Sequence, residues 1–138
     1  MERSLVLVKP DAMERQLAGA ILSRLQAEGL KLISLKMLHM DKTMAERHYA
    51  VHKGKLFFED TIAYITSAPI VAAAFEGEDA IARIRKVMGA TDPAKAAPGT
   101  IRSAYGLDMM RNSTHASDSP ENGEKEIALY FTKKEIFG

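Results

Sequence analysis

The sequence predicts an α/β protein of the α+β sandwich kind, with one four-stranded antiparallel sheet and helices packed on one of its faces. Two observations predict this fold. Short apolar runs of strand length alternate with longer segments whose apolar residues recur at helical spacing. In addition, 138 residues without a cysteine suffice for one domain with an apolar core and without a disulfide framework.

The first two strands flank a helix. Residues 5–8 form a continuous apolar run that stops at Lys9 and Pro10, which predicts a buried strand closed by the proline. Residues 17–25 carry leucine and isoleucine at helical spacing, and Gly29 stands where a C-terminal cap belongs. Residues 31–40 alternate apolar and polar side chains and predict the second strand.

Two short helices are expected next. Residues 43–46, Thr-Met-Ala-Glu, read as a capping box, so a helix that carries His48 and Tyr49 should begin there. Residues 56–65 are again helix-like. Because the adjacent Phe57 and Phe58 cannot share one helix face, we expect one in the core and the other free to stack on a ligand.

The second half repeats the alternation. Residues 70–75 predict the third strand and residues 78–88 a helix that ends at Gly89. The long loop 91–100 is typical of functional or contact-making segments. Residues 101–111 predict a helical turn and then a weak strand that approaches His115, and Ser119 or Asp118 caps a last helix with Pro120 at its first position. This order is the βαββαβ, ferredoxin-like arrangement.

The segment 112–119, Asn-Ser-Thr-His-Ala-Ser-Asp-Ser, is the most compact polar stretch of the chain. It places His115, a potential nucleophile or proton carrier, among short donors and acceptors that could orient it. On composition alone, a turn rich in serine and aspartate with a chance histidine is the favoured interpretation. The other motifs decide between these readings.

Phosphate binding would have to come from side chains, because no glycine-rich phosphate loop is present. Each candidate has an ordinary alternative as a solvated surface group, and none is convincing singly. The candidates are Lys9, Arg85, Arg102, Arg111 and the hydroxyl of Thr91. The four histidines, which include His39 and His52 as expected surface residues, lack metal-ligand spacing, so a metal held directly by the protein is not expected.

Bulk composition limits partners and location. The net charge of +1 does not indicate an overall electrostatic grip on nucleic acid. No apolar run is long enough for a signal peptide or a membrane span, so we expect a cytoplasmic protein without a membrane partner.

Taken together, four motifs closely resemble the nucleoside diphosphate kinase family from about Ser4 to Phe131. They are Lys9-Pro10-Asp11, His48-Tyr49, Pro98-Gly99-Thr100-Ile101-Arg102, and Arg111-Asn112 followed by His115-Ala116-Ser117-Asp118-Ser119. The resemblance makes His115 the strong favourite as the family's phosphate-accepting histidine. It implies transfer of the terminal phosphate of ATP or another triphosphate to a nucleoside diphosphate, in ping-pong steps and with broad base specificity.

The resemblance also implies roles for other side chains. Phe57 would stack on the base, Ser117 and Glu126 would support the histidine, and Asp118 would reach nucleotide-bound Mg²⁺ through water. The remaining substrate contacts would be Lys9, Tyr49, Arg85, Thr91, Arg102 and Asn112. Where the family often has glycine, the chain carries Met110 and Ala116, and Thr61 replaces a larger apolar residue near the base.

Family members are homo-oligomers, so we expect a hexamer first and a tetramer second. Two other functions remain to be weighed. A nucleic-acid-binding module would show salt-dependent binding that survives loss of His115. A regulatory or assembly domain without catalysis would make the polar cluster around His115 dispensable. The near-neutral net charge of +1 disfavours the first, and the intact set of contact residues disfavours the second.

Overall fold

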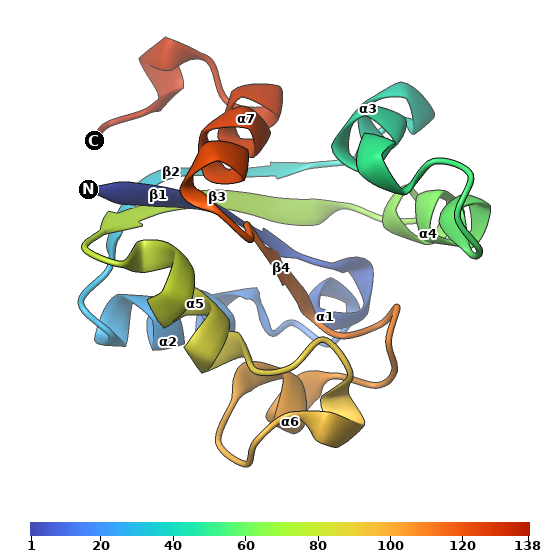
Figure 1. Ribbon diagram of the computed structural model, residues 1–138, viewed down its shortest axis with the longest axis horizontal. Helices are drawn as coiled ribbons and strands as arrows, with labels where there is room; N and C mark the ends of the chain where they lie inside the picture. The colour runs from blue at the N-terminus through green and yellow to red at the C-terminus, as the bar shows by residue number, and fades with distance from the viewer.

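One antiparallel sheet organises the chain. The computed structural model describes residues 1–138. Its four strands lie in the order β2-β3-β1-β4, and every neighbouring pair is antiparallel (Figure 1). The strands are β1 (Glu2–Val8), β2 (Lys31–Leu38), β3 (Ile70–Gly77) and β4 (Thr114–Ala116). This is the predicted ferredoxin-like sheet.

Seven α-helices and three short 3-10 turns connect and follow the strands. The α-helices are α1 (Pro10–Glu14), α2 (Ala18–Ala27), α3 (Lys42–His48), α4 (Phe58–Ile65), α5 (Ala80–Met88), α6 (Ile101–Tyr105) and α7 (Pro120–Tyr130). The 3-10 turns are η1 (Ala50–His52), η2 (Pro93–Lys95) and η3 (Lys133–Glu135). No helix has the length and apolar character that crossing a membrane requires.

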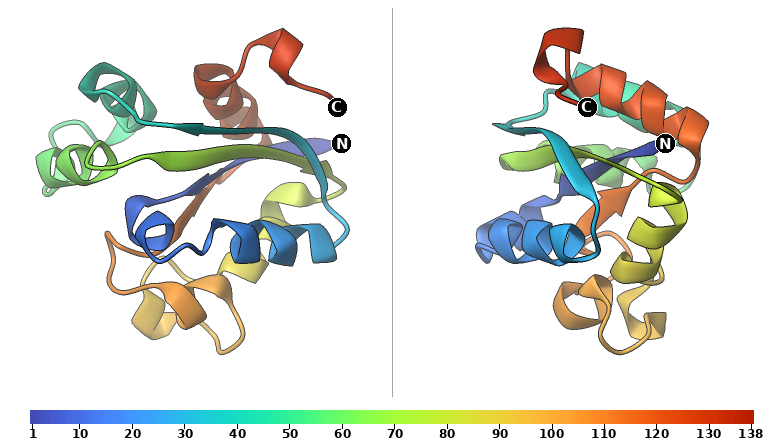
Figure 2. Two further views of the ribbon diagram at one scale, coloured as in Figure 1. Left: turned by 180° about the vertical axis from the view of Figure 1, so that it is seen from behind. Right: turned by 90° about the vertical axis from the view of Figure 1, so that its left-hand side faces the viewer.

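The helices cover both faces of the sheet, so the expectation of helices on one face was wrong. Helices α1, α2 and α5 lie on one side, and α3, α4 and α7 lie on the other (Figures 1 and 2). Val6 and Val8 of β1 belong to the core on the α2 and α5 side, whereas Leu5 and Leu7 belong to the core on the α4 and α7 side. A strand that is apolar at every position needs cover on both faces, which explains the arrangement.

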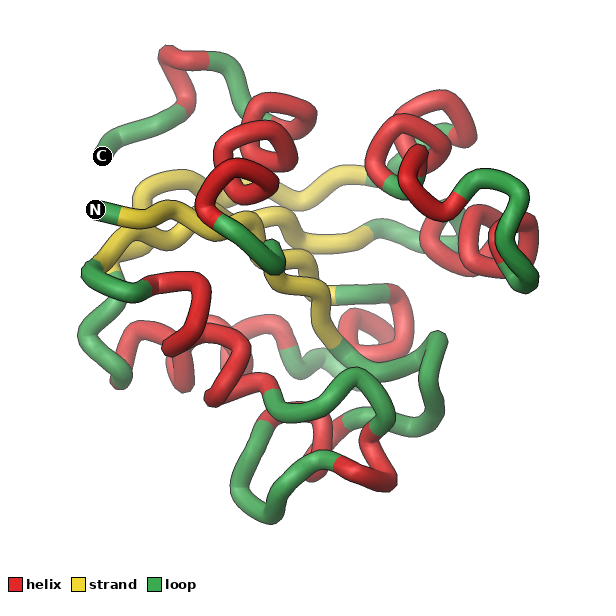
Figure 3. The backbone as a smooth tube through the Cα atoms, viewed as in Figure 1, coloured by secondary structure: helices red, strands yellow, loops and turns green.

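Several element boundaries differ from the predictions. The short helix α1 was not predicted. Pro10 begins it, because the fixed φ of proline suits a first helical position. The side chain of Asp41, rather than Thr43, caps α3 by accepting the backbone N–H of Met44 at 2.8 Å. Helix α5 begins at Ala80, two residues late. The segment between α5 and β4 is mostly loop, as Figure 3 shows, but it includes η2 and α6.

The weak fourth strand contains His115 itself. In the β1–β4 register, His115 pairs with Leu7, and Ala116 pairs with Val6. Directly paired residues of antiparallel strands project to the same face. His115 therefore faces the side that carries α3 and α7, while Ala116 is buried in the core on the opposite side.

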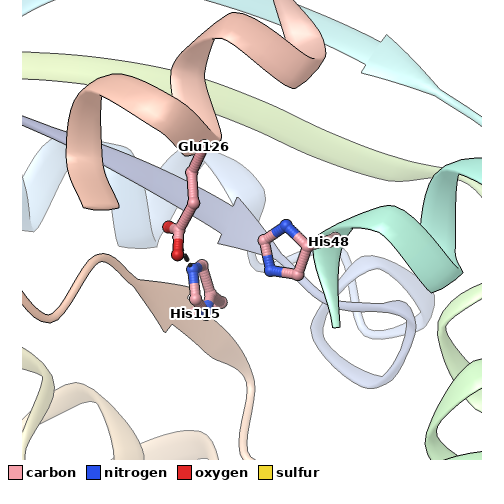
Figure 4. Close-up of side chains that lie close together, drawn as sticks. All are labelled: His48, His115 and Glu126. Atoms are coloured by element: carbon pink, nitrogen blue, oxygen red, sulfur yellow. Dashed lines mark hydrogen bonds and ion pairs between the residues drawn. The ribbon is translucent and has the colours of Figure 1, made fainter. Parts of the chain in front are cut away.

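Helix α7 lies directly against β1 because of one glycine. A Cβ atom at Gly123 would overlap the carbonyl oxygen of Arg3. Ser119 begins the helix by accepting the N–H of Asn122 at 3.1 Å, as predicted, with Pro120 at the first position. This close approach brings Glu126, one turn further along α7, over the sheet beside β4 (Figure 4).

Candidate active site

A cleft of about 590 Å³ opens beside His115. Its lining comes from segments that are far apart in the sequence, including β4 and helices α3, α4, α5 and α7. Among the predicted site residues, the lining includes Lys9, Tyr49, Phe57, Arg85, Thr91, Arg102, Asn112, His115, Asp118 and Glu126. Ser117 lies behind the lining and is fully buried. Arg111 is the one predicted phosphate ligand that lies elsewhere; it pairs with Asp108 at 2.7 Å and lines a second cavity.

Glu126 orients the imidazole of His115. The Nε2 atom of His115 lies 2.8 Å from Oε1 of Glu126 (Figure 4). The hydroxyl of Ser117 donates to the same oxygen at 2.8 Å. Burial raises the pKa of Glu126, but these bonds outweigh burial and hold the pKa below its usual value. An ionised carboxylate can only accept, so Nε2 carries the proton and Nδ1 keeps its lone pair.

Ser117 is fixed in turn by the sheet. Its Oγ accepts the backbone N–H of Leu5 at 3.0 Å, so the hydroxyl proton is free to point at Glu126. Three successive hydrogen bonds therefore connect the backbone of β1 to Ser117, Ser117 to Glu126, and Glu126 to His115. The group that holds the second ring nitrogen of His115 is thus a carboxylate.

His48 is a neighbour of His115 that the sequence analysis assigned no role. The two ring centroids are 4.7 Å apart with nearly perpendicular planes, and Nδ1 of His48 lies 3.1 Å from the hydroxyl of Tyr130. Burial, together with His115, lowers the pKa of His48 to about 3, so this ring is neutral at physiological pH. Its only sequence signal was its place beside Tyr49. The other two histidines, His39 and His52, are exposed, as expected.

Lys9 and Asn112 form one wall of the cleft. Nζ of Lys9 donates to Oδ1 of Asn112 at 2.8 Å, and the amide of Asn112 donates to the carbonyl of Thr91 at 3.0 Å. Burial and the nearby Arg102 lower the pKa of Lys9 to about 8. The ammonium is therefore charged at neutral pH and is held by a neutral partner, which leaves its charge available to an anion.

Arg102 is buried beneath the cleft. Its guanidinium donates to the carbonyls of Gly89 and Thr114, each at 2.9 Å, while its Nε is buried without a protein partner. Burial and Arg85 lower the pKa of Arg102 to about 10, so it stays charged at neutral pH. Arg85 is exposed, and its guanidinium makes no hydrogen bond with the protein. Two arginines and one lysine thus give the cleft a positive wall for phosphates.

The backbone beside His115 is held in an unusual conformation. Ser113 is buried and has a φ of +74°, a left-handed conformation that costs about 1–3 kcal/mol for a residue with a side chain. The carboxylate of Asp11 accepts its N–H at 3.0 Å and also bonds the hydroxyl of Tyr64. Asp11 therefore positions the segment that leads into β4, a role that no local sequence pattern indicated.

The outer rim of the cleft is aromatic. Phe57 is 63% exposed and lines the cleft, whereas Phe58 is 6% exposed and belongs to the core, which confirms that only one of the two rings is buried. Phe57 precedes α4 with a φ of +69°, so the chain reverses there. Thr61 also lines the rim. An exposed ring at the mouth of a charged cleft offers a stacking surface to a planar ligand.

One carboxylate in the cleft suits a hydrated divalent cation. Asp118 is exposed, and its hydrogen bond with Asn122 at 2.7 Å holds its pKa below the usual value. The other cleft carboxylate, Glu126, is engaged by His115 and Ser117. A single free oxygen donor fits a magnesium-like ion that keeps most of its waters and is held mainly by ligand phosphates.

The two residues that replace glycine are accommodated. Met110 lines the cleft, and its carbonyl lies 3.4 Å from Nζ of Lys9. The methyl of Ala116 is buried in the core on the face opposite His115. Neither side chain blocks the space beside His115.

Comparisons with known proteins all identify the same family. The model of the nucleoside diphosphate kinase family matches residues 2–136. A nucleoside diphosphate kinase of Dehalococcoides mccartyi is 54% identical over 136 residues, covering 99% of this chain and 96% of the relative. One of Roseiflexus sp. is 51% identical, covering 99% and 91%.

Solved structures show the same similarity. The nucleoside diphosphate kinase of Aquifex aeolicus superposes with a TM-score of 0.95 at 44% identity and covers 98% of each chain. The halophilic enzyme of Halobacterium salinarum, solved in complex with CDP, superposes with a TM-score of 0.96 at 45% identity, covering 99% of this chain and 91% of that one.

Proposed function

The chain belongs to the nucleoside diphosphate kinase family, and we propose that Nδ1 of His115 carries the phosphate between nucleotides. As a member, it transfers the terminal phosphate of a nucleoside triphosphate to a nucleoside diphosphate and uses a divalent metal. One observation supports the choice of atom above others. Glu126 engages Nε2 at 2.8 Å, whereas Nδ1 makes no hydrogen bond with the protein.

The proposed first half-reaction forms one bond and breaks one. The lone pair of Nδ1 attacks the terminal phosphorus of the triphosphate, and the bond from that phosphorus to the bridging oxygen breaks. The nucleoside diphosphate leaves with the bonding electrons, and the ring becomes a phosphorylated imidazolium. The carboxylate of Glu126, which accepts the Nε2 proton, stabilises this positive charge.

The second half-reaction reverses these steps with another diphosphate. Its terminal oxygen attacks the phosphorus, and Nδ1 regains its lone pair. Because donor and acceptor use the same cleft in turn, the kinetics are ping-pong. Phosphoryl transfer depends on alignment and charge neutralisation more than on covalent help, and the positive wall of Lys9, Arg85 and Arg102 suits that need.

We assign Mg²⁺ as the divalent metal. It would arrive on the nucleotide phosphates, neutralise charge that develops on them, and contact Asp118 through water. Thr91 and Asn112 would hold the remaining phosphate and sugar oxygens, and Tyr49 would close the same mouth. Phe57 would stack on the base without a hydrogen-bond code, which predicts broad base specificity, with ATP as the main donor. The complex of the Halobacterium relative with CDP is consistent with this.

Incubation with radiolabelled ATP and Mg²⁺ tests the proposal. We expect an acid-labile, base-stable phosphoprotein that any nucleoside diphosphate discharges. His115→Ala should not become labelled, whereas His39→Ala, which changes an exposed histidine outside the cleft, should label like the parent protein. Persistent label in His115→Ala would refute the assignment.

We further propose a single catalytic domain that assembles as a hexamer, with a tetramer as the second choice, in the cytoplasm. Strand β2 is an open edge of the sheet, and its Leu35 and Met37 are exposed. Exposed apolar residues on an unpaired edge strand favour association with another copy. Sedimentation equilibrium should give the mass of six chains, and a monomer mass would contradict the assembly.

A further inference from the structure

We propose that His48, His115 and Glu126 form a binding site for a zinc-like transition metal ion that switches His115 off. Each of the three residues offers one ligand atom, and these atoms all lie within 4.8 Å of one another. The side chains come from α3, β4 and α7 and converge on one point (Figure 4). Since the ligands lie on three separate elements, no spacing along the chain could reveal the site.

The donor set selects the metal. Two imidazoles and one carboxylate are a usual zinc ligand set, whereas Mg²⁺ prefers oxygen donors alone. Metal binding requires unprotonated ligands. In its unprotonated form, each of the three side chains offers one ligand atom with a lone pair to the ion. This zinc site is therefore distinct from the site of the Mg²⁺ ion that the nucleotide carries.

The hydrogen bond on the second ring nitrogen of His48 suits a histidine that binds a metal ion. Nδ1 of His48 lies 3.1 Å from the hydroxyl of Tyr130, and that hydroxyl can itself donate to the sulfur of Met40 at 3.6 Å. If Nδ1 donates to Tyr130, Nε2 of His48 has its lone pair free for a metal. Histidine ligands usually donate their second ring N–H in this way.

The separation of the ligand atoms is close to what zinc needs. Bonds of about 2.0–2.1 Å in a tetrahedral site place ligand atoms roughly 3.4 Å apart. Nε2 of His115 and Oε1 of Glu126 are already 2.8 Å apart, so His48 makes most of the adjustment. All three side chains are partly exposed rather than packed in the core, which permits a shift of this size. A fourth position, toward the cleft, stays open for water.

Zinc at this site blocks attack by His115 because it changes which ring nitrogen of His115 carries the proton. A neutral imidazole carries one proton, and a metal on Nε2 requires that proton to sit on Nδ1. No proton is lost; it moves from one ring nitrogen to the other. Nδ1 then has no lone pair for attack on phosphorus, and Glu126 is diverted to the metal. This consequence, unlike the binding itself, rests on the proposed role of Nδ1.

Binding is tested without nucleotide on protein that carries no affinity tag. Calorimetric titration with zinc alone should show one site per chain. His48→Gln and Glu126→Gln should each weaken that site at least about tenfold. His39→Gln, which removes an exposed histidine bonded only to the carbonyl of Thr66, should leave it unchanged. Equal zinc affinity in the parent and in both ligand variants would overturn the proposal; if one variant does not fold, the other decides.

Inhibition is measured next, with each protein's rate expressed relative to its own zinc-free rate. Zinc should slow phosphorylation by Mg·ATP in the parent and in His39→Gln, and a chelator should restore the rate. His48→Gln should require at least about ten times more zinc for the same relative inhibition. Zinc binding without label on His115 would defeat the proposed function alone, whereas label on His115 without zinc binding would defeat this inference alone.

Discussion

In the proposed mechanism, Glu126 determines which nitrogen of His115 reacts. A histidine on an exposed strand could present either ring nitrogen, and a wrong tautomer would be inert. Here the carboxylate is ionised, engages Nε2, and is itself held by Ser117. Under the proposed mechanism, the same carboxylate would face the positive charge that phosphorylation creates. One side chain would then set the direction of attack and stabilise its product.

The lowered pKa of Lys9 predicts that activity falls at alkaline pH. Its pKa of about 8 means that the protonated, charged form prevails below pH 8 and is lost above it. Since phosphate binding needs that charge, kcat/KM, which reports the free enzyme, should fall as the pH rises through about 8. Lys9→Arg keeps its charge in this range, so its relative profile should stay flat there. A parent profile that is flat well above pH 8 would contradict the role of Lys9.

Phe57 and Phe58 form a matched pair of variants. Phe58→Ala removes a buried ring and should lower the free energy of unfolding by about 3–5 kcal/mol. Phe57→Ala removes an exposed ring and should leave stability nearly unchanged. It should instead weaken nucleotide binding by about 1–3 kcal/mol, similarly for every base. Denaturant unfolding and nucleotide titration measure the two effects, and an exchange of these outcomes would reject the stacking role.

At the scale of elements, the site depends on how β4 and α7 meet β1. Strand β4 has only three residues, yet its pairing with β1 decides the face to which His115 projects. A shift of the register by one residue would turn His115 toward the opposite core. Helix α7 then supplies Glu126 because Gly123 lets it lie directly on β1.

Gly123→Ala should therefore damage both stability and activity. The added methyl overlaps the carbonyl of Arg3, so α7 must move away from β1 and carry Glu126 with it. We expect a loss of about 1–3 kcal/mol in the free energy of unfolding and slower phosphorylation of His115. Gly19→Ala in α2 is the control, because nothing lies near its added methyl; it should gain about 0.5–1 kcal/mol. Identical behaviour of the two variants would contradict the packing argument.

At the scale of the whole molecule, the site lies where elements from both halves of the chain converge on one sheet. Local signals predicted three features that the structure confirms: Gly29 after α2, Ser119 and Pro120 at the start of α7, and the burial of only one ring of the pair Phe57 and Phe58. Each of these depends on neighbours within a few residues. The substrate contacts that the family resemblance implied likewise all line the cleft.

Two features of the site that were not predicted depend on contacts between distant segments. His48 lies beside His115, and Asp11 holds Ser113, through contacts between segments that are distant in the sequence, which no local pattern encodes. The cover of helices on both faces of the sheet could have been predicted, since the run Leu5-Val6-Leu7-Val8 is apolar on both faces of its strand. Thr43 was predicted as the cap of α3, but the helix begins earlier and Asp41 caps it.

The most direct test of the central claim is to determine which ring nitrogen of His115 carries the phosphate. Nuclear magnetic resonance of the protein labelled with nitrogen-15 and phosphorylated by Mg·ATP resolves the two isomers through their phosphorus–nitrogen couplings. Because Glu126 engages Nε2, we predict that the phosphate is bonded to Nδ1. A phosphate on Nε2 of His115 would contradict the account.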